Sequence, residues 1–426
     1  MLLGLCDRTV LEHVDIDEDA ETVVAHVRPK RPKKRRCGRC GRLSPHEDNG
    51  DGRRRWRGLD LGTVQVWLEA DAPRVRCRDH GRVVAAVPWA RHGARQTRAF
   101  EDTAGWLVTQ CSKTAVSGLL RIAWRTVGGI VTRVVGEIDA RVDRLDGLRR
   151  IGIDEISYKR GHNLTVVVDH DTGRLVWAAA GRDEKTLRGF FDVLGEQRCA
   201  QITHVSADAA DWIATVVAER CGNAVRCADP FHIVKWATEA LDEVRRQAWN
   251  DARARARREP VRGRGRPRSD APPRPGHERA RALKHARYAL WKNPEDLTQR
   301  QHAKLEWIAK TDPRLHRAYL LKEGLRHVFK VKGEAGKEAL DRWLSWAQRC
   351  RIPAFVELQR RIRRHREAID AALEHGLSQG LIESTNTKLR VLTRMAFGFR
   401  SPDALIALGM LALGGYRPSL PGRTAA

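Results

Sequence analysis

Three acidic residues occupy positions at which carboxylates can hold divalent metal ions. Asp154 ends the apolar run Ile151-Gly152-Ile153-Asp154, which is typical of a buried strand, where a charge is costly unless a partner or a metal neutralises it. Asp208 follows another strand-like run, and Glu383 begins a helical segment. Two Mg²⁺ ions about 3.5–4 Å apart, held by carboxylates, stabilise the attacking and leaving oxygens when a phosphodiester bond is broken. Asp154, Asp208 and Glu383 are therefore candidate ligands for two catalytic Mg²⁺ ions, and three ordinary structural acids are the alternative.

Other polar residues accompany these acids. Asn386 and Arg390 follow Glu383 at helical spacing, so the three side chains share one helix face. Asn386 would orient a phosphate or a ligand carboxylate, and Arg390 would hold a phosphate oxygen. Asp229, in Asp229-Pro230-Phe231-His232, is an alternative to Asp208 because it also follows a strand-like run. If Asp208 is the ligand, Asp229 and His232 would support the site from outside.

A second group of potential ligands lies near the N-terminus. Cys37-Gly38-Arg39-Cys40 and Cys77-Arg78-Asp79-His80 each present two ligands from one tight turn, and four such ligands complete a tetrahedral Zn²⁺ site. We predict one structural Zn²⁺, with the residues between the pairs forming an inserted hairpin. His46 and His92 are alternatives to His80. The remaining cysteines are expected to be small core residues: Cys6, Cys111, Cys199, Cys221, Cys227 and Cys350.

The charge of the chain indicates its partner. Lys and Arg number 79 against 53 Asp and Glu, a net charge of +26, which attracts phosphate polymers. The apolar run 404–416 is too short to span a bilayer and predicts a buried helix. The apolar start is broken at Asp7, too early for a signal peptide. We expect a cytoplasmic, nucleoid-associated protein that binds double-stranded DNA and no membrane.

The acids need a sheet to bring them together, and residues 150–228 supply the pattern for one. Apolar runs and helical periodicity predict the order β-β-β-α-β-α-β. This order is typical of the ribonuclease-H-like fold, a mixed sheet covered by helices, in which the fourth strand lies beside the first. That neighbourhood favours Asp208 over Asp229. The strands are expected at 151–154, 164–168, 175–179, 202–206 and 224–227, and the helices at 184–194 and 212–221.

Residues 97–138 have helical periodicity, with breaks at Cys111-Ser112 and before Trp124. Three short helices with these breaks suit a helix-turn-helix whose last helix enters the major groove. Trp124, Arg125 and Thr126 would then contact DNA from its first turn. A helical connector without a DNA role is the alternative.

The chain after Phe231 is mainly helical, with one interruption. Residues 251–287 are rich in arginine and contain Pro and Gly, and we interpret them as a flexible basic linker. Within it, Arg264 and Arg266 would suit a narrow minor groove. A merely solvated linker is the alternative.

Together these motifs resemble those of bacterial insertion-sequence transposases of the ISL-three family, over nearly the full length. The matching pieces are the cysteine pairs, the helix-turn-helix, Gly152-Ile153-Asp154-Glu155, the segment 228–235 around Asp-Pro-Phe-His, and 383–400 with its Gly398-Phe399-Arg400 ending. The resemblance implies a DDE triad of Asp154, Asp208 and Glu383 in a ribonuclease-H-like domain that a helical insertion interrupts.

The resemblance also implies a multidomain α/β organisation. We expect a zinc-binding domain at 1–95, a helix-turn-helix domain at 96–140, catalytic core at 148–234 and 376–418, and the insertion at 235–375. Such a protein would bind terminal inverted repeats and target DNA as a homo-oligomer, cleave the strands and transfer them. The alternatives are a transcriptional regulator derived from a transposase and a nuclease of the same fold that does not transfer strands.

Overall fold

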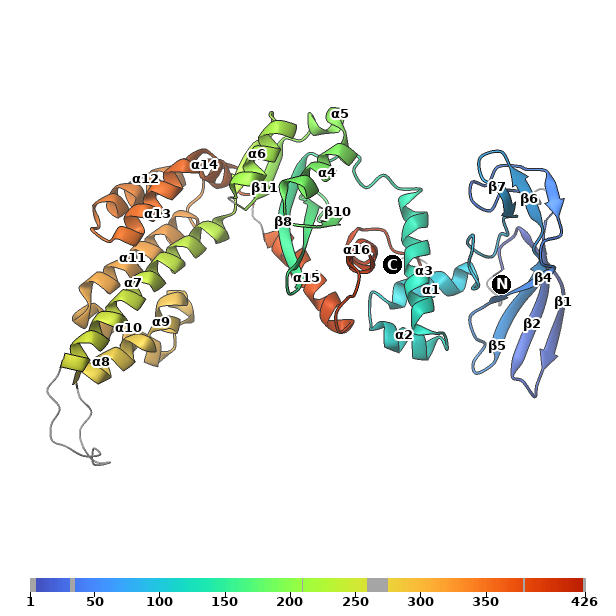
Figure 1. Cartoon of the computed structure of the whole chain (residues 1–426), viewed down its shortest axis with the longest axis horizontal. Helices are drawn as coiled ribbons and strands as arrows, with labels where there is room; N and C mark the ends of the chain where they lie inside the picture. Colours follow the sequence, from blue (N-terminus) through green and yellow to red (C-terminus); the bar gives the residue numbers. More distant parts are fainter. Residues whose placement is uncertain (1–4, 31–34, 209, 259–274, 378–379, 424–426) are drawn as a thin grey trace, which may run out of the picture.

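The computed structural model describes residues 5–30, 35–208, 210–258, 275–377 and 380–423. These residues form a row of units in chain order (Figure 1). An N-terminal β region is followed by three helices, then by a mixed sheet, and then by a long helical unit. The chain returns from the helical unit to the sheet through its last two helices.

The N-terminal region contains two sheets. The first has the order β1-β2-β5-β4, from Thr9–Asp17, Thr22–Pro29, Gln65–Asp71 and Arg53–Arg57. The second joins β3 (His46–Asp48), β6 (Arg74–Cys77) and β7 (Gly81–Val84). The predicted hairpin between the cysteine pairs is present as β4 and β5, which pair antiparallel. It is part of a larger sheet than expected, because β5 also pairs parallel with β2.

Three helices follow: α1 (Arg98–Leu107), α2 (Lys113–Leu119) and α3 (Trp124–Asp139). The breaks between them fall where the periodicity predicts them. The side chains of Thr97 and Ser112 cap α1 and α2 by accepting hydrogen bonds from backbone N–H groups of the first turn. These caps fix where α1 and α2 begin, and therefore which residues form their apolar faces.

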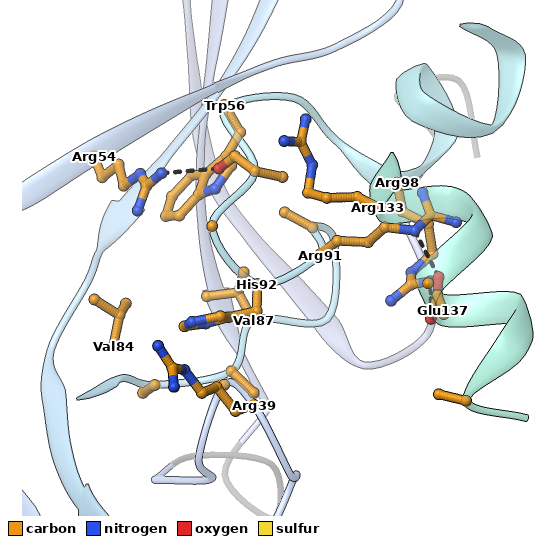
Figure 2. Close-up of a pocket in the computed structure, with 18 residues that line it drawn as sticks. Arg39, Arg54, Trp56, Val84, Val87, Arg91, His92, Arg98, Arg133 and Glu137 are labelled. Atoms are coloured by element: carbon orange, nitrogen blue, oxygen red, sulfur yellow. Dashed lines mark hydrogen bonds and ion pairs between the residues drawn. The ribbon is translucent and has the colours of Figure 1, made fainter. Parts of the chain in front are cut away.

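A buried charge network fixes the β region against these helices. Arg91 forms ion pairs with Glu101, Asp102 and Glu137, and Arg133 also pairs with Glu101, which is fully buried. Figure 2 shows Arg91 and Glu137 on one side of a pocket of about 620 Å³ that residues of β4 also line. Because the loss of one member leaves an unpaired buried charge, the network opposes separation of the two units.

The mixed sheet has the predicted ribonuclease-H-like order, β10-β9-β8-β11-β12. The strands β8, β9 and β10 pair antiparallel, whereas β11 is parallel to both β8 and β12. The helices α4 and α6 cover one face, with the short helix α5 (Glu196–Cys199) beside them. The bounds are β8 (Arg150–Lys159), β9 (His162–Asp169), β10 (Leu175–Ala180), α4 (Glu184–Leu194), β11 (His204–Ala207), α6 (Asp211–Arg220) and β12 (Val225–Ala228).

The other face of the sheet lies under α15 (Gly380–Met395) and α16 (Pro402–Leu413). One hydrophobic core joins these two helices, the sheet and α1–α3. Ile156 and Leu164 of the sheet, Leu389 of α15, Leu408 of α16 and Ile130 of α3 all belong to it. The helix-turn-helix therefore does not have a core separate from that of the sheet. Among the described residues, no helix is both long and apolar enough to cross a membrane.

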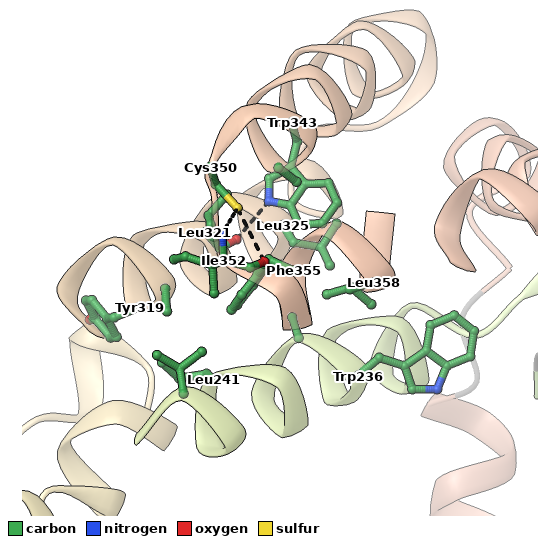
Figure 3. Close-up of a cluster of buried hydrophobic side chains, with 14 of the residues drawn as sticks. Trp236, Leu241, Tyr319, Leu321, Leu325, Trp343, Cys350, Ile352, Phe355 and Leu358 are labelled. Carbon is green, nitrogen blue, oxygen red and sulfur yellow. Dashed lines mark hydrogen bonds between the residues drawn. The ribbon is translucent and has the colours of Figure 1, made fainter. Parts of the chain in front are cut away.

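The helical unit has its own core. Trp236 and Leu241 of α7 share this core with Leu321, Trp343 and Phe355 of other helices, and Figure 3 shows part of the cluster. Its elements are α7 (Pro230–Arg258), α8 (Pro275–Lys284), α9 (Arg287–Trp291), a 3₁₀ turn (Pro294–Asp296), α10 (Gln299–Thr311), α11 (Pro313–Val328), α12 (Gly333–Arg349), α13 (Pro353–Arg364) and α14 (Arg366–His375).

The interpretation of 251–287 as a flexible linker is wrong at both ends. Residues 251–258 continue α7, and 275–284 form α8. Ala252 and Ala256 are buried at helical spacing, and Ala252 shares the core of the unit with Leu283 of α8. Alanine and arginine both favour helix, and a face of alanines is apolar enough to pack. Residues 259–274, with Arg264 and Arg266, lie outside the described residues.

Candidate catalytic and metal sites

Parallel pairing brings the predicted acids to one edge of the sheet. Ala207 at the end of β11 is in register with Ile153 of β8 and with Ala228 of β12. The residues that follow these three in the chain therefore lie side by side: Asp154, Asp208 and Asp229. Both rivals for the second acid are present at the same edge.

The helix α15 brings the remaining predicted residues to this edge. Its buried side chains Ile382 and Leu389 face the sheet. Asn386, also buried, donates a hydrogen bond of 2.6 Å from Nδ2 to Oδ2 of Asp154. Glu383, one turn earlier, is exposed and lines a cavity of about 300 Å³ together with Asp229. Arg390 is exposed one turn further along the helix.

The gathered carboxylates perturb one another. Burial, together with the negative charges of Asp208 and Asp229, raises the pKa of Asp154 to about 6, while the Glu155 N–H and His232 oppose the rise. Partial desolvation also raises the pKa of Glu383, with Asp229 contributing. Such a site favours a bound cation, because a cation would stabilise the ionised carboxylates.

His232 links the two rival acids. Its Nδ1 lies 2.6 Å from Oδ2 of Asp229, and its Nε2 lies 3.5 Å from Oδ2 of Asp208. The other oxygen of Asp229 accepts a 3.0 Å hydrogen bond from the backbone N–H of Phe231. The hydrogen bond to Asp229 raises the pKa of His232, against the effect of burial. Asp229 thus has both oxygens engaged and a side chain only 3% exposed, whereas that of Asp208 is 26% exposed.

Sequence reasoning missed one pair at the edge of this site. Glu155, beside Asp154, has a largely buried side chain that pairs with Arg182 at 3.0 Å. Its position next to an acid in a buried strand was the available signal. Burial raises the pKa of Glu155 as well, so it adds to the acidic character of this edge.

The predicted zinc ligands come together. The ligand atoms of Cys37, Cys40, Cys77 and His80 all lie within 4.8 Å of one another. The Sγ atoms of Cys40 and Cys77 are 3.7 Å apart, and Nδ1 of His80 lies 3.6 Å from Sγ of Cys77. The hydrogen bond from His80 lowers the pKa of Cys77 to about 6, toward the thiolate that Zn²⁺ requires. His46 and His92, the two alternatives, are not members of this group.

The first turn of α3 is accessible. Trp124 is 53% exposed, Arg125 is exposed and Thr126 is half-buried. Nζ of the buried Lys113 lies 5.0 Å from the Trp124 ring and 5.8 Å from that of Phe399. The predicted DNA-contacting residues therefore face outward, while Lys113 ties their helix to the segment after α15.

Three family models match the chain in the order of these units. The model described as "zinc-finger of transposase IS204/IS1001/IS1096/IS1165" matches residues 33–80. The model described as "Helix-turn-helix domain of transposase family ISL3" matches 85–135. The model described as "Transposase", of the DDE type, matches 151–408, more than half of the chain.

Whole-length relatives agree with these matches. The transposase for insertion sequence element IS1557 of Mycobacterium tuberculosis, from two strains, is 70% identical over 427 residues, covering 99% of this chain and 96% of its own length. The transposase for IS1001 of Bordetella parapertussis is 25% identical over 356 residues, covering 82% of each chain.

Proposed function

This chain belongs to the ISL3 family of insertion-sequence transposases, and we propose that Asp154, Asp208 and Glu383 are the carboxylates with which it cuts and joins DNA. As a DDE transposase, the chain is an enzyme that acts on DNA. The observation that carries the proposal is the convergence of these acids at one edge of the sheet, with Asn386 bonded to Asp154. Carboxylates that gather in this way are typical of functional sites, where a bound cation can balance their charge.

Two observations support Asp208 over Asp229 as the second ligand. The strand before Asp208 is the neighbour of the strand that carries Asp154. Asp229 uses one oxygen on the Phe231 N–H and the other on His232, so it has less freedom to bind an ion. Asp229 then acts as a positioning residue, because it fixes the His232 ring so that Nε2 faces Asp208.

The donor set fits hard divalent ions. Carboxylate oxygens are the ligands that Mg²⁺ prefers, and among the described residues the buried Oδ1 of Asn386 has no hydrogen-bond partner. Two Mg²⁺ ions, when bound, would activate the attacking oxygen and neutralise the leaving one. Asn386 holds the Asp154 carboxylate in one orientation, and Glu383, one turn earlier, lines a cavity together with Asp229. Arg390, exposed on α15, would hold a phosphate oxygen of the substrate.

Recognition of DNA is assigned to the N-terminal units. Phosphate contacts at the acidic edge position DNA without reading its sequence, whereas side chains in a groove read base edges. The exposed first turn of α3, with Trp124, Arg125 and Thr126, would read the terminal inverted repeats. One structural Zn²⁺ held by the ligand group Cys37, Cys40, Cys77 and His80 would stabilise the preceding region. Target DNA would use the acidic edge alone, and joining two ends calls for a homo-oligomer on DNA.

Isosteric variants of the full-length protein test the acid assignment. Asp154→Asn, Asp208→Asn and Glu383→Gln should each lower Mg²⁺-dependent cleavage of end DNA by at least about 10²–10³-fold, because each removes a charge that acts in the transition state. Asp229→Asn should cost only about 10–100-fold, as a change outside the ligand shell does. Binding of end DNA should be nearly unchanged in all four variants.

The matched control is Asp211→Asn, because the Asp211 side chain is 93% exposed near this edge. Normal cleavage by Asp208→Asn together with loss in Asp229→Asn would show that the second acid is Asp229. Strand transfer is measured separately, by joining of the cut end to a second duplex. Cleavage without joining would indicate a nuclease reaction and contradict the proposed strand transfer.

A further inference from the structure

An exposed aromatic residue ends the helix that carries Glu383. Phe397 is 93% exposed, more than any other large apolar side chain that the structure describes. Its φ is +53°, and the N–H of Gly398 bonds back to Thr393 O at 2.8 Å. Phe397 therefore occupies the left-handed position of a helix C-cap, which favours glycine or asparagine. A bulky residue is strained there, and this one gains no packing in return.

A row of cations leads from the acidic edge to Phe397. Arg390, Arg394 and Phe397 follow Glu383 at helical spacing, so they lie on one face of α15 and its cap. Both arginines are exposed, and neither forms an ion pair within the described part of the chain. Free guanidinium groups on such a face suit the phosphates of a DNA backbone. At 1.5 Å per residue, the row spans about 20 Å, or roughly six base-pair steps of 3.4 Å.

The loop after α15 is anchored beside the reading helix. Phe399, two residues beyond Phe397, is buried in the core that α1–α3 share with the sheet. Its ring lies 5.8 Å from Nζ of Lys113, which in turn lies 5.0 Å from the ring of Trp124. Phe397 thus lies two residues before a side chain that is anchored beside the first turn of α3.

We propose that Phe397 inserts into the base stack of the end DNA about six base pairs from the scissile phosphate, while Arg390 and Arg394 hold the backbone between. The proposal rests on the function assigned above and extends it to a residue that acts on the bases. Apolar wedges inserted between base steps unstack them and kink the duplex. The kink would bring the scissile phosphate down to the carboxylates at the sheet edge. A flexible pyrimidine–purine step is the favoured position for it.

Fluorescence of 2-aminopurine tests insertion without cleavage. The full-length protein with Glu383→Gln is bound to end DNA that carries the probe at each position from three to nine base pairs inside the cut. We expect a rise of several-fold at one step, caused by unstacking, and no rise when Phe397→Asn is added. Asparagine suits the left-handed backbone, so this variant keeps the cap while removing the ring. Val193→Ala, which trims another exposed apolar residue, is the matched control and should keep the signal.

Cleavage gives the second readout, with Glu383 intact. Phe397→Asn should slow cleavage of fully paired ends by about 10–100-fold, since unstacking one step costs a few kcal/mol. A mismatch at the step found by fluorescence should restore most of the rate, because the unstacking is then already provided. An unchanged fluorescence rise in Phe397→Asn, or failure of the mismatch to restore cleavage, would overturn the proposal.

Two further outcomes keep the inference separate from the proposed function. If Asp154→Asn cleaves normally, the acid assignment fails, but the fluorescence rise still reports on Phe397. Light scattering measures the oligomeric state of the DNA-free protein. If Phe397→Asn changes this state and leaves the fluorescence rise on end DNA as it was, then Phe397 is a contact between copies of the chain and the DNA wedge is refuted.

Discussion

Asn386 of α15 donates a 2.6 Å hydrogen bond to the carboxylate of Asp154 on β8, a residue 232 positions earlier in the chain. This bond joins the two parts of the sheet domain that the helical insertion separates in the sequence. Together with the burial of Ile382 and Leu389, it fixes the rotation of α15 and therefore the side of the helix that carries Glu383.

Loss of this bond should weaken Mg²⁺ binding more than it destabilises the fold. Asn386→Ala leaves Asp154 without its orienting donor, and changes of this kind typically cost about 10–100-fold in metal affinity or activity. Cleavage rates measured over a range of Mg²⁺ concentrations should show a higher half-saturating concentration. Thr387→Ala, at the exposed neighbouring position, is the control and should behave as wild type. A lower rate with an unchanged Mg²⁺ requirement would contradict an orienting role.

Asp154 should destabilise the metal-free protein at neutral pH. Burial raises its folded-state pKa to about 6 from an ordinary value of 3.8. A raised folded-state pKa means that ionisation opposes folding, so the penalty is absent below pH 4 and complete above about pH 7. The shift corresponds to about 3 kcal/mol, and the single oxygen of asparagine forfeits about 1 kcal/mol of hydrogen bonding.

Asp154→Asn should therefore stabilise the metal-free protein by about 2 kcal/mol at pH 8 and not at pH 4. Denaturant unfolding in the presence of a chelator, followed by a probe of the sheet domain, measures this difference. Equal gains at both pH values would show that the effect comes from packing rather than from charge.

The chain should carry about one Zn²⁺. Metal analysis of the purified full-length protein should give one equivalent, and Cys37→Ser combined with Cys77→Ser should lose it. Both thiols are buried in the small core of the three-stranded sheet, so the double variant should also unfold locally. Cys6→Ser is the control, because Cys6 is exposed and outside the ligand group. Zinc retained by the double variant would exclude this ligand set.

Different residues should govern sequence-specific recognition of DNA and general attraction to it. Arg125→Ala should reduce the preference for end DNA over scrambled DNA by about 1–3 kcal/mol, the usual value of one good base contact. Replacing Arg253, Arg255 and Arg257 of α7 should instead weaken binding to every sequence alike and reduce its salt dependence. Binding titrations at several salt concentrations distinguish the two. A uniform loss in Arg125→Ala would place this residue on the backbone rather than on a base.

Local patterns predicted the parts of the fold that local chemistry determines. Apolar runs and turn residues marked the strands of the mixed sheet, and the predicted bounds of α4 match the observed helix. Asp154 and Asp208 are candidates from the strand pattern, because Asp154 interrupts an apolar strand and Asp208 follows a neighbouring one, and the family resemblance selects them together with Glu383. The zinc ligands could be chosen from spacing alone, although only the structure separates His80 from His46 and His92.

Long-range packing accounts for what the sequence did not predict. The parallel pairing of β2 with β5 depends on two segments that are distant in the chain. The burial of Ala252 depends on α8 folding back along α7. The exposure of Phe397 is likewise invisible in sequence, where an aromatic residue after a helix is usually taken for core.

The core shared by the helix-turn-helix and the mixed sheet constrains the DNA as much as the protein. Because this core joins the first turn of α3 to the sheet that carries the acids, we expect the DNA between the bases that are read and the phosphate that is cut to have a set length and a set rotation. One added base pair would move the phosphate by 3.4 Å and turn it by about a tenth of a helical turn. The left and right termini of the element should therefore share one spacing, and length changes there should be tolerated far less than changes of sequence.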